Sequence, residues 1–487
     1  MISKAIFFNL HNNIDRPGGC YRIASFLREQ GWDVEVIDYI LYWSLDELKD
    51  VILSRGDINF FGFSSSFSIW NQNIEDIILW IKQKYPDAIT MLGGQGVENI
   101  KSKVDYVITG YAENALLAIL KNHRDEIKID PYWEKRQKRV IRHEYYPSAP
   151  MNSLKTIYED RDYLRPEEWL ITETSRGCYF ECAFCQYPIL GVRGDYTRSA
   201  EDFEIQLRDT YDRFGIQNYY IADETFNDRT DKIIKYANVV DRLPFQPYFS
   251  GFIRADLLVS RPEQKEHLLR MGFIGHYYGI ETTNHETGKI IGKGMNPDKL
   301  MPGILEIRDY FKKHGPYRGQ ISLIIGLPKE TEETLEKTFQ WLIDNWQGES
   351  VAAYTLGIPL DPAFYKLSKM SRDWEKLGYR PSSILPTVMP NHKLTHLENN
   401  DWSAGLNWEN DHMTMHRAEE IEKKFKDELI DKYDFRAPSW NIGEQMYYGK
   451  TLKEALDIHY REINERSEVG QMHIKKYKEK KINNDPK

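Results

Sequence analysis

Short apolar runs alternate with amphipathic stretches over the first third of the 487-residue chain. The runs are rich in β-branched and aromatic residues, and several end in Gly or Ser, which is typical of buried strands. The stretches between them place apolar residues at helical spacing, and two of them end at Gly31 and Pro86. Strands that alternate with helices imply a parallel sheet covered on both faces, so we predict a doubly wound, flavodoxin-like α/β domain over residues 1–125. Its predicted strands are 5–9, 34–39, 58–64, 89–94 and 105–110.

The same alternation returns after residue 165 and predicts a partial (β/α)6 TIM-like barrel over 165–370. In such a barrel, ligands and chemistry lie at the carboxyl ends of the strands. The charged, Pro-containing stretch 126–164 is predicted to be a linker. Residues 371–487 are predicted to be mainly helical, with a clear helix at 415–433 and a basic tail that is frayed in solvent. The predicted barrel strands are 169–175, 218–224, 249–255, 276–281, 320–327 and 352–358.

Three of the four cysteines, Cys178, Cys182 and Cys185, form a C-x3-C-x2-C pattern directly after the first predicted barrel strand. Cysteines can pack as small apolar residues, but three in one short loop would be an unusual way to do so. A structural zinc site takes four ligands, and no fourth Cys or His stands near this loop in the sequence. A [4Fe–4S] cluster normally takes four thiolates, so three would leave one iron with an open position. An open position on a metal usually serves chemistry.

The loop SRGCYFECAFC resembles the signature loop of the radical S-adenosylmethionine (SAM) enzymes. The resemblance implies that Cys178, Cys182 and Cys185 bind three irons of a [4Fe–4S] cluster, and that SAM chelates the fourth. Such enzymes cleave SAM reductively to a 5′-deoxyadenosyl radical. The family has an aromatic residue before the last cysteine, and Phe184 matches it, so Phe184 is assigned to SAM binding. The resemblance extends over 165–360.

Other predicted strand ends match the same family. The resemblance implies that Asp223 and Glu224, after the second barrel strand, meet the ammonium group of SAM. Arg254, after the third strand, would hold a carboxylate in a bidentate contact, with an ion pair to Asp256 as the alternative. Glu281, after the fourth strand, would contact the ribose or the methionine part of SAM.

The turn IIGLPKET after the fifth barrel strand resembles the part of the family fold beside the adenine. Gly326 and Pro328 are assigned to SAM binding there, because a missing side chain lets a flat ring approach the backbone. The sixth strand departs from the family's frequent Pro-Gly-Thr turn and reads GIPLDPAFY. The C-terminal segment is predicted to close the barrel mouth, with Trp408 among the candidates for substrate contact.

The N-terminal strands resemble the cobalamin-binding domain that precedes the barrel in one large class of radical SAM enzymes. Cobalamin domains often carry an Asp-x-His-x-x-Gly motif, and the corresponding loop here reads NLHNNI, which keeps the histidine alone. If cobalamin binds, the resemblance implies methyl transfer to an unactivated carbon. If the sheet only completes the substrate cleft, rearrangement, cyclisation or oxidation is the alternative. The residues assigned to cobalamin are Asn9, His11, Ser64, Ser65, Gly93, Gly94 and Gly110.

Composition narrows the remaining functions and partners. Only Cys20 lies outside the cluster loop, so methylthio transfer and auxiliary clusters lack their ligands. The net charge of −9 gives no support for nucleic-acid binding. No run of apolar residues is long enough to span a membrane, and grouped thiols without a disulfide framework favour the cytoplasm. The expected partners are a small-molecule or peptide substrate and an external one-electron reductant such as flavodoxin or ferredoxin. A non-catalytic zinc-binding module is the alternative of another class.

Overall fold

The computed structural model describes two six-stranded sheets and their covering helices. The front sheet has the strand order β2-β1-β3-β4-β5-β6, and all of its pairings are parallel. This order is that of a doubly wound sheet and confirms the predicted fold class. The described residues are 3–10, 16–65, 72–94, 97, 102–121, 127–142, 145–146, 149–151, 155–185, 197–360, 368–384, 405–429, 432–433 and 463–484.

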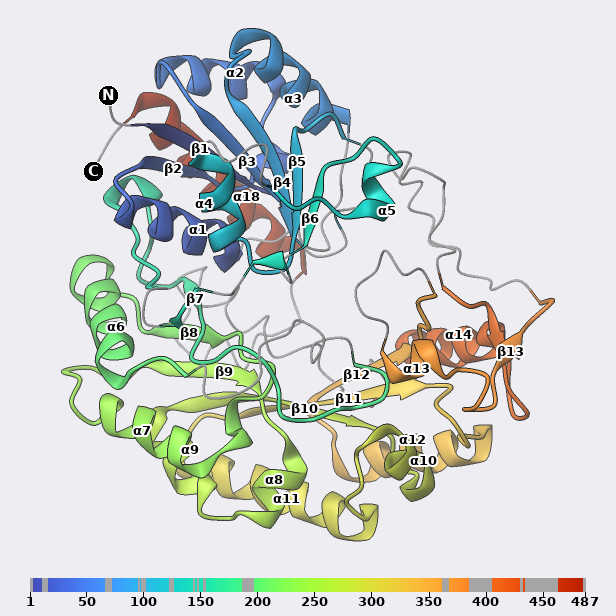
Figure 1. Ribbon diagram of the computed structural model, residues 1–487. Helices are drawn as coiled ribbons and strands as arrows, with labels where there is room; N and C mark the ends of the chain where they lie inside the picture. Colours follow the sequence, from blue (N-terminus) through green and yellow to red (C-terminus); the bar gives the residue numbers. More distant parts are fainter. Residues whose placement is uncertain are drawn as a thin grey trace.

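Helices cover both faces of the front sheet because its strands are apolar on both faces. Side chains of α1 and α4 share a core with one face, and side chains of α2 and α3 share a core with the other (Figure 1). Gly62 in β3 lacks a side chain where one is impossible, since a Cβ there would lie 2.3 Å from the ring of Phe7. The strands are β1 (Lys4–Asn9), β2 (Asp33–Ile37), β3 (Phe60–Ser64), β4 (Ile89–Gly94), β5 (Tyr106–Thr109) and β6 (Val140–Arg142). The helices are α1 (Gly18–Glu29), α2 (Leu45–Ser54), α3 (Gln72–Lys84) and α4 (Glu113–Leu120).

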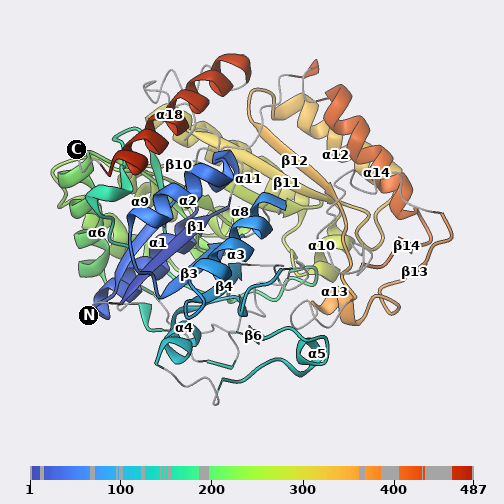
Figure 2. The same cartoon turned by 90° about the horizontal axis from the view of Figure 1, so that it is seen from above.

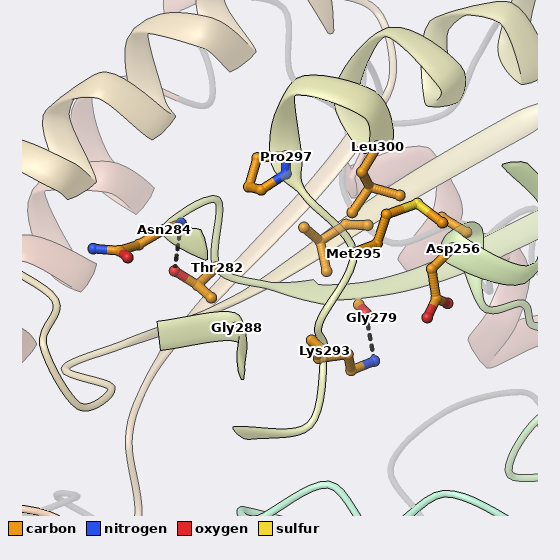
Figure 3. Close-up of a pocket in the computed structure, with 11 residues that line it drawn as sticks. Asp256, Gly279, Thr282, Asn284, Gly288, Lys293, Met295, Pro297 and Leu300 are labelled. Carbon is orange, nitrogen blue, oxygen red and sulfur yellow. Dashed lines mark hydrogen bonds between the residues drawn. The ribbon is translucent and has the colours of Figure 1, made fainter. Parts of the chain in front are cut away.

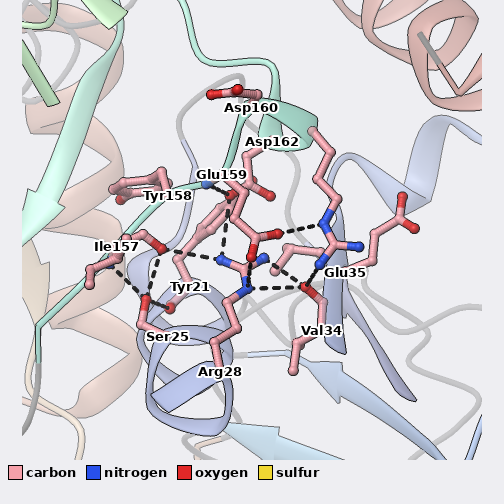
Figure 4. A network of polar contacts seen from close by, with 12 residues as sticks. Tyr21, Ser25, Arg28, Val34, Glu35, Ile157, Tyr158, Glu159, Asp160 and Asp162 are labelled. Atoms are coloured by element: carbon pink, nitrogen blue, oxygen red, sulfur yellow. Dashed lines mark hydrogen bonds and ion pairs between the residues drawn. The ribbon is translucent and has the colours of Figure 1, made fainter. Parts of the chain in front are cut away.

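The predicted linker 126–164 is wrong in two places, because parts of it belong to the front unit. Residues Val140–Arg142 add strand β6 to the sheet, next to a short helix α5 (Pro131–Glu134). Further on, Arg28 of α1 donates to the carbonyl oxygens of Val34 and Ile157 at 2.7 and 3.2 Å (Figure 4). Glu159 of this stretch pairs with Arg28 of α1 at 3.1 Å, and Arg161 pairs with Asp33 of β2 at 2.7 Å. Its charges thus serve internal contacts, which charge alone could not distinguish from those of a solvated linker.

The second sheet is the predicted partial barrel. Its strands follow one another in chain order from β7 to β12, all pairings are parallel, and the sheet stays open. Figure 1 shows its helices on the side turned away from the front unit. The strands are β7 (Trp169–Thr172), β8 (Asn218–Ile221), β9 (Tyr248–Phe252), β10 (Phe273–Glu281), β11 (Arg318–Ile325) and β12 (Ser350–Thr355). The helices are α6 (Ala200–Phe214), α7 (Thr230–Val240), α8 (Ala255–Ser260), α9 (Gln264–Met271), α10 (His285–Ile291), α11 (Pro297–His314) and α12 (Glu332–Asn345).

The C-terminal segment serves both units. Near the barrel it forms α13 (Lys369–Arg372), β13 (Arg380–Pro381), β14 (Trp408–Glu409) and α14 (Met415–Lys424), which continues as a π-helical turn over Phe425–Leu429. Its last helix, α18 (Ile463–Asn483), lies instead beside α2 of the front unit (Figure 2). Tyr477 of α18 is buried there, and Lys481 lies 3.0 Å from Glu35. The prediction of a frayed basic tail is therefore wrong for this helix, because its lysines alternate with side chains that enter the core. None of the described helices has the length and apolar composition of a membrane span.

Candidate active site

The cysteine loop leaves the carboxyl end of β7 and is held by backbone hydrogen bonds. Ala183 N donates to Ile291 O at 3.0 Å, and Met370 N donates to Ala183 O at 2.8 Å. A tight turn is closed by Cys185 N, which donates to Cys182 O at 3.0 Å. The end of α10 and the start of α13 therefore hold the loop between Cys182 and Cys185.

Polar groups from neighbouring strand ends contact two of the thiols. Cys178 Sγ lies 3.5 Å from Thr225 Oγ1, and Arg254 Nη1 lies 3.6 Å from Cys182 Sγ. The guanidinium of Arg254 also lies 3.8 Å from the centre of the Phe180 ring. Arg254 thus places a positive charge between the Cys182 sulfur and the Phe180 ring.

The thiols are not arranged around a single metal ion. A zinc ion holds ligand atoms at about 2.0–2.3 Å, so its ligands must converge on one point. Among the residues that the structure describes, no three His, Cys, Asp or Glu side chains do so.

Asp223 holds the start of the cysteine loop in place. This role replaces its predicted assignment to the ammonium group of SAM. Its buried carboxylate accepts hydrogen bonds from Thr174 N at 2.7 Å and Ser175 N at 3.0 Å. Lys232 Nζ lies 3.1 Å from the same carboxylate. With these partners, Asp223 anchors the first residues of the loop and is closed to a ligand.

Glu224 points the other way, into the contact between the two sheets. Its Oε2 accepts from Gly177 N at 3.0 Å, next to the first cysteine, and its Oε1 accepts from the Tyr111 hydroxyl at 3.4 Å. Burial raises the pKa of Glu224 to about 7. The sequence predicted one shared role for Asp223 and Glu224. In the structure, Asp223 contacts the cysteine loop, and Glu224 lies in the contact between the two sheets.

Arg254 forms the ion pair that was the alternative to a bound carboxylate. Its Nε and Nη2 donate to the two carboxylate oxygens of Asp256 at 3.0 and 2.6 Å. Its remaining nitrogen faces Cys182, as described above. The two nitrogens of Arg254 that could hold a ligand carboxylate are therefore already paired with Asp256.

Glu281 lies at the end of β10 in a left-handed backbone conformation, with φ of 68°. Such a backbone is strained for a residue with a side chain and often marks a functional site. Burial raises the pKa of Glu281, and Lys293, 3.7 Å away, opposes this. Lys293 also donates to Gly279 O at 2.7 Å and lines a pocket with Asp256 and Met295 (Figure 3). Sequence analysis missed Lys293, which lies in the loop after α10.

Gly326, in the turn after β11, lacks a side chain for a reason other than a bound adenine. A Cβ on Gly326 would lie 2.3 Å from the indole of Trp408, which is fully buried and donates to Leu356 O at 2.8 Å. The space left by the missing side chain is therefore filled by the C-terminal segment, and Trp408 is closed to substrate. Pro328 contributes its carbonyl oxygen, which accepts from Thr287 at 2.7 Å.

Phe184 packs partly buried against the barrel core, and this neither supports nor opposes its assignment to SAM. Glu330 was missed by sequence analysis, although it belongs to the quoted turn. Its carboxylate accepts from Gly326 N at 2.9 Å and Thr282 Oγ1 at 3.1 Å, and burial raises its pKa to about 7.

The carboxyl edge of the front sheet contains buried polar groups without partners. Asn9 Nδ2 donates to Asp38 at 2.6 Å, but Asn9 Oδ1, Ser65 Oγ and Thr109 Oγ1 have no hydrogen-bond partner among the described residues. Thr109 was not predicted, although it ends β5 directly before Gly110.

The glycines and the remaining residues of this edge lie around those groups. Gly94 and Gly110 have φ of 140° and 83°, which other residues rarely adopt. The missing Cβ of Gly93 would have no neighbour closer than 3.9 Å, and Ser64 lies against Gly19 at the start of α1. His11 lies outside the described residues.

The two sheets meet through an ionic contact that sequence analysis did not predict. Arg176, two residues before the first cysteine, lies 2.7 Å from Glu113 of α4 and 3.0 Å from Glu173. Its guanidinium lies 4.0 Å from the centre of the Tyr111 ring. Tyr111 and Glu113 follow β5, so the carboxyl end of a front strand contacts the cysteine loop directly.

Comparison with known proteins agrees with this arrangement. Residues 172–342 match the family model of the radical SAM superfamily. The uncharacterized methyltransferase PH0819 of Pyrococcus horikoshii is 22% identical over 347 residues, which cover 67% of this chain and 72% of that protein. The structure of the radical SAM methyltransferase TsrM from Kitasatospora setae, with cobalamin and a [4Fe-4S] cluster bound, is similar over 98% of this chain and 100% of its own, with a TM-score of 0.65 and 14% identity.

A second solved structure has the same organisation. The cobalamin-dependent SAM radical enzyme OxsB, with aqua-cobalamin bound, is similar over 99% of this chain and 72% of its own, with a TM-score of 0.59 and 13% identity. Residues 172–342 thus form a radical SAM domain, and this class of domain indicates an enzyme. The similarity to both structures extends over the unit that precedes this domain, so this unit shares their fold.

Proposed function

We propose that this protein is a cobalamin-dependent radical SAM enzyme that methylates an unactivated carbon of its substrate. The observation that carries the proposal is the contact between the two strand edges. Tyr111 and Glu113 lie at the edge where a cobalamin would bind. Tyr111 donates to Glu224, which also accepts from Gly177 N, and Glu113 forms an ion pair with Arg176. Arg176 and Gly177 directly precede Cys178. Two cofactors held at these edges would face each other, as methyl transfer to a carbon radical requires.

The donor set of the loop fits a [4Fe–4S] cluster. Cys178, Cys182 and Cys185 supply three thiolates and leave one iron for SAM, while Arg254 offsets negative charge at Cys182. When bound, the cluster and SAM would supply a 5′-deoxyadenosyl radical, and cobalamin would supply the methyl group. The protein's part is to fix the loop through Asp223 and Ala183.

The front edge fits a large polar ligand such as cobalamin. Ser65 and Thr109 offer buried hydroxyl groups that have no partner in the described part of the chain, and Gly93, Gly94 and Gly110 leave room for close approach to the backbone. Within the proposed SAM site, the carboxylate of Glu281 would meet the ammonium group of the methionine part, and the ammonium group of Lys293 would meet its carboxylate. A separate protein, such as flavodoxin or ferredoxin, would deliver the electron.

One product analysis tests the proposal. The protein is purified without oxygen, its cluster is restored, and SAM, a strong reductant and hydroxocobalamin are added, so that reduced cobalamin can accept the methyl group of SAM. We expect both 5′-deoxyadenosine and S-adenosylhomocysteine, and the second should form only when cobalamin is present. The Cys182→Ala variant should give neither product, because it loses a cluster ligand.

Cys20→Ala is the matched control, because Cys20 is buried in the core of α1 away from the loop and should tolerate the change with product formation intact. Full activity of Cys182→Ala would refute the cluster assignment. Formation of 5′-deoxyadenosine without S-adenosylhomocysteine would refute methyl transfer and favour a cobalamin-independent rearrangement, cyclisation or oxidation.

A further inference from the structure

The barrel sheet has an outer face, which helices cover, and an inner face, which is turned toward the front unit (Figure 1). Helices cover the outer face, where Tyr219 contacts Thr210 of α6 and His276 packs against Phe311 of α11. Neighbouring residues in a strand point to opposite faces, so Tyr220 and Tyr277 belong to the inner face. This face is turned toward the front unit (Figure 1).

Three aromatic rings form one surface on this inner face. Tyr220 of β8, Phe252 of β9 and Tyr277 of β10 have ring centres 5.5–6.5 Å apart. Tyr277 is fully buried beneath the other two, whereas Phe252 is 42% exposed. A large apolar side chain that is left open inside a fold marks a surface that a ligand covers.

The aromatic surface continues directly into the site of the cysteine loop. Phe252 and Arg254 are two residues apart in extended backbone, so they share a face, about 7 Å apart along the strand. Arg254 contacts Cys182 at 3.6 Å. A molecule on Phe252 therefore lies within one small-molecule length of the cluster ligand.

Buried hydrogen-bond acceptors without partners lie beside the rings. Gln320 of β11 is the register partner of Tyr277, and Tyr277 is the register partner of Phe252. Gln320 Nε2 donates to Ser322 at 3.1 Å, but its buried Oε1 has no partner among the described residues. Ser250 Oγ, next to Phe252 in β9 and on the same face, is buried and unpartnered as well.

We propose that Phe252, Tyr220 and Gln320 form the substrate site and bind an aromatic ring that carries an N–H or O–H donor. The substrate ring lies against the exposed ring of Phe252, with Tyr220 beside it at an interplanar angle of 78° to Phe252, and its donor is directed to Gln320 Oε1. This inference rests on the proposed function, because it makes the carbon to be methylated part of that aromatic compound or of the group attached to it. An aliphatic substrate would gain less from two aromatic rings in an edge-to-face arrangement.

Binding of small probes to the cluster-restored protein tests the site, with indole, 1-methylindole and cyclohexanol measured by ligand-observed NMR under anaerobic conditions. We expect indole to bind more tightly than either other probe, because 1-methylindole lacks the donor and cyclohexanol lacks the aromatic face. Phe252→Ala should weaken indole about tenfold, and Phe252→Tyr should retain it. Gln320→Leu should make indole and 1-methylindole bind equally.

The matched control is Tyr42→Ala, since Tyr42 has the same exposed fraction of 42% but lies on the front unit. It should leave indole binding unchanged. Equal indole binding by Phe252→Ala and the unchanged protein would refute the site. Reductive cleavage of SAM without substrate separates this failure from failure of the proposed function. Phe252→Ala should still form 5′-deoxyadenosine if the cluster assignment holds.

Discussion

The carboxyl edges of the two parallel sheets differ in how their buried polar groups are satisfied. At the barrel edge, Asp223 receives hydrogen bonds from Thr174 and Ser175 and an ion pair from Lys232. At the front edge, Ser65 and Thr109 have buried hydroxyl groups without a partner among the described residues. Both are carboxyl edges of parallel six-stranded sheets in one molecule, so parallel strand pairing alone does not explain the difference.

Buried polar groups without partners lower stability, so a protein retains few of them without cause. At the barrel edge, the polar groups build the loop that carries the cysteines, and stability and function depend on the same contacts. At the front edge, we propose that the polar groups instead await the cobalamin of the proposed function. A residue that binds a cofactor should thus be recognised by what it leaves unsatisfied, and a residue that supports the site by its partners.

The largest effect is expected for Asp223→Ala. The change leaves two backbone N–H groups of the loop and the buried Lys232 without this carboxylate, and should lower the free energy of unfolding by about 3–5 kcal/mol. Urea denaturation under anaerobic conditions measures it. Asp231→Ala is the control, since the ion pair of Asp231 with Arg229 is exposed and should contribute less than about 1 kcal/mol. Equal effects of the two changes would contradict the anchoring role.

Glu330 should give the barrel edge a pH dependence. Burial raises its pKa from 4.5 to about 7, so the folded state holds a proton that the unfolded state has lost between these values. Stability should therefore fall as the pH rises from 4.5 to 7, by about 3 kcal/mol from this residue. Glu330→Gln should remove that part of the slope in denaturation curves recorded across the window. Glu333→Gln, on the surface of α12, should leave the slope in place.

Thr174→Val should cost about 1–2 kcal/mol, because it removes a buried hydroxyl that donates to Asp223. Thermal unfolding at fixed pH detects a loss of this size. Valine has nearly the same shape as threonine, so the loss reports the hydrogen bond. An unchanged midpoint would mean that the barrel edge is less tightly satisfied than the contacts imply.

The smallest effect on stability is expected for the same substitution at the front edge. Thr109→Val removes a buried hydroxyl for which the described residues supply no partner, and should change the free energy of unfolding by less than about 0.5 kcal/mol. The variant should nevertheless bind cobalamin about fivefold more weakly, measured by the change in the visible spectrum on titration. If Thr109→Val destabilises the protein as much as Thr174→Val does, the contrast between the edges is wrong.

The fold and the cysteine loop could be predicted because they depend on local pattern. Strand periodicity located both sheets, and the spacing of Cys178, Cys182 and Cys185 located the loop. Long-range partners could not be predicted in this way. Gly326 reads as a ligand-facing turn until Trp408, over 80 residues later, is known to fill its space. Asp223 and Glu224 are adjacent in the sequence, and only the fold directs one to the loop and the other to Tyr111.

Helix α18 has a consequence for how the chain is made. Glu35 and Asp38 in the front unit find partners in Lys481 and Tyr477, and the first of these pairs is separated by 446 residues. At roughly 5–20 residues per second, a ribosome would need about 20–90 s to cover that distance. During this interval the emerging front domain would display an apolar face that its own carboxyl terminus later covers. Nascent chains of this protein should therefore depend on a chaperone at the ribosome until synthesis reaches α18.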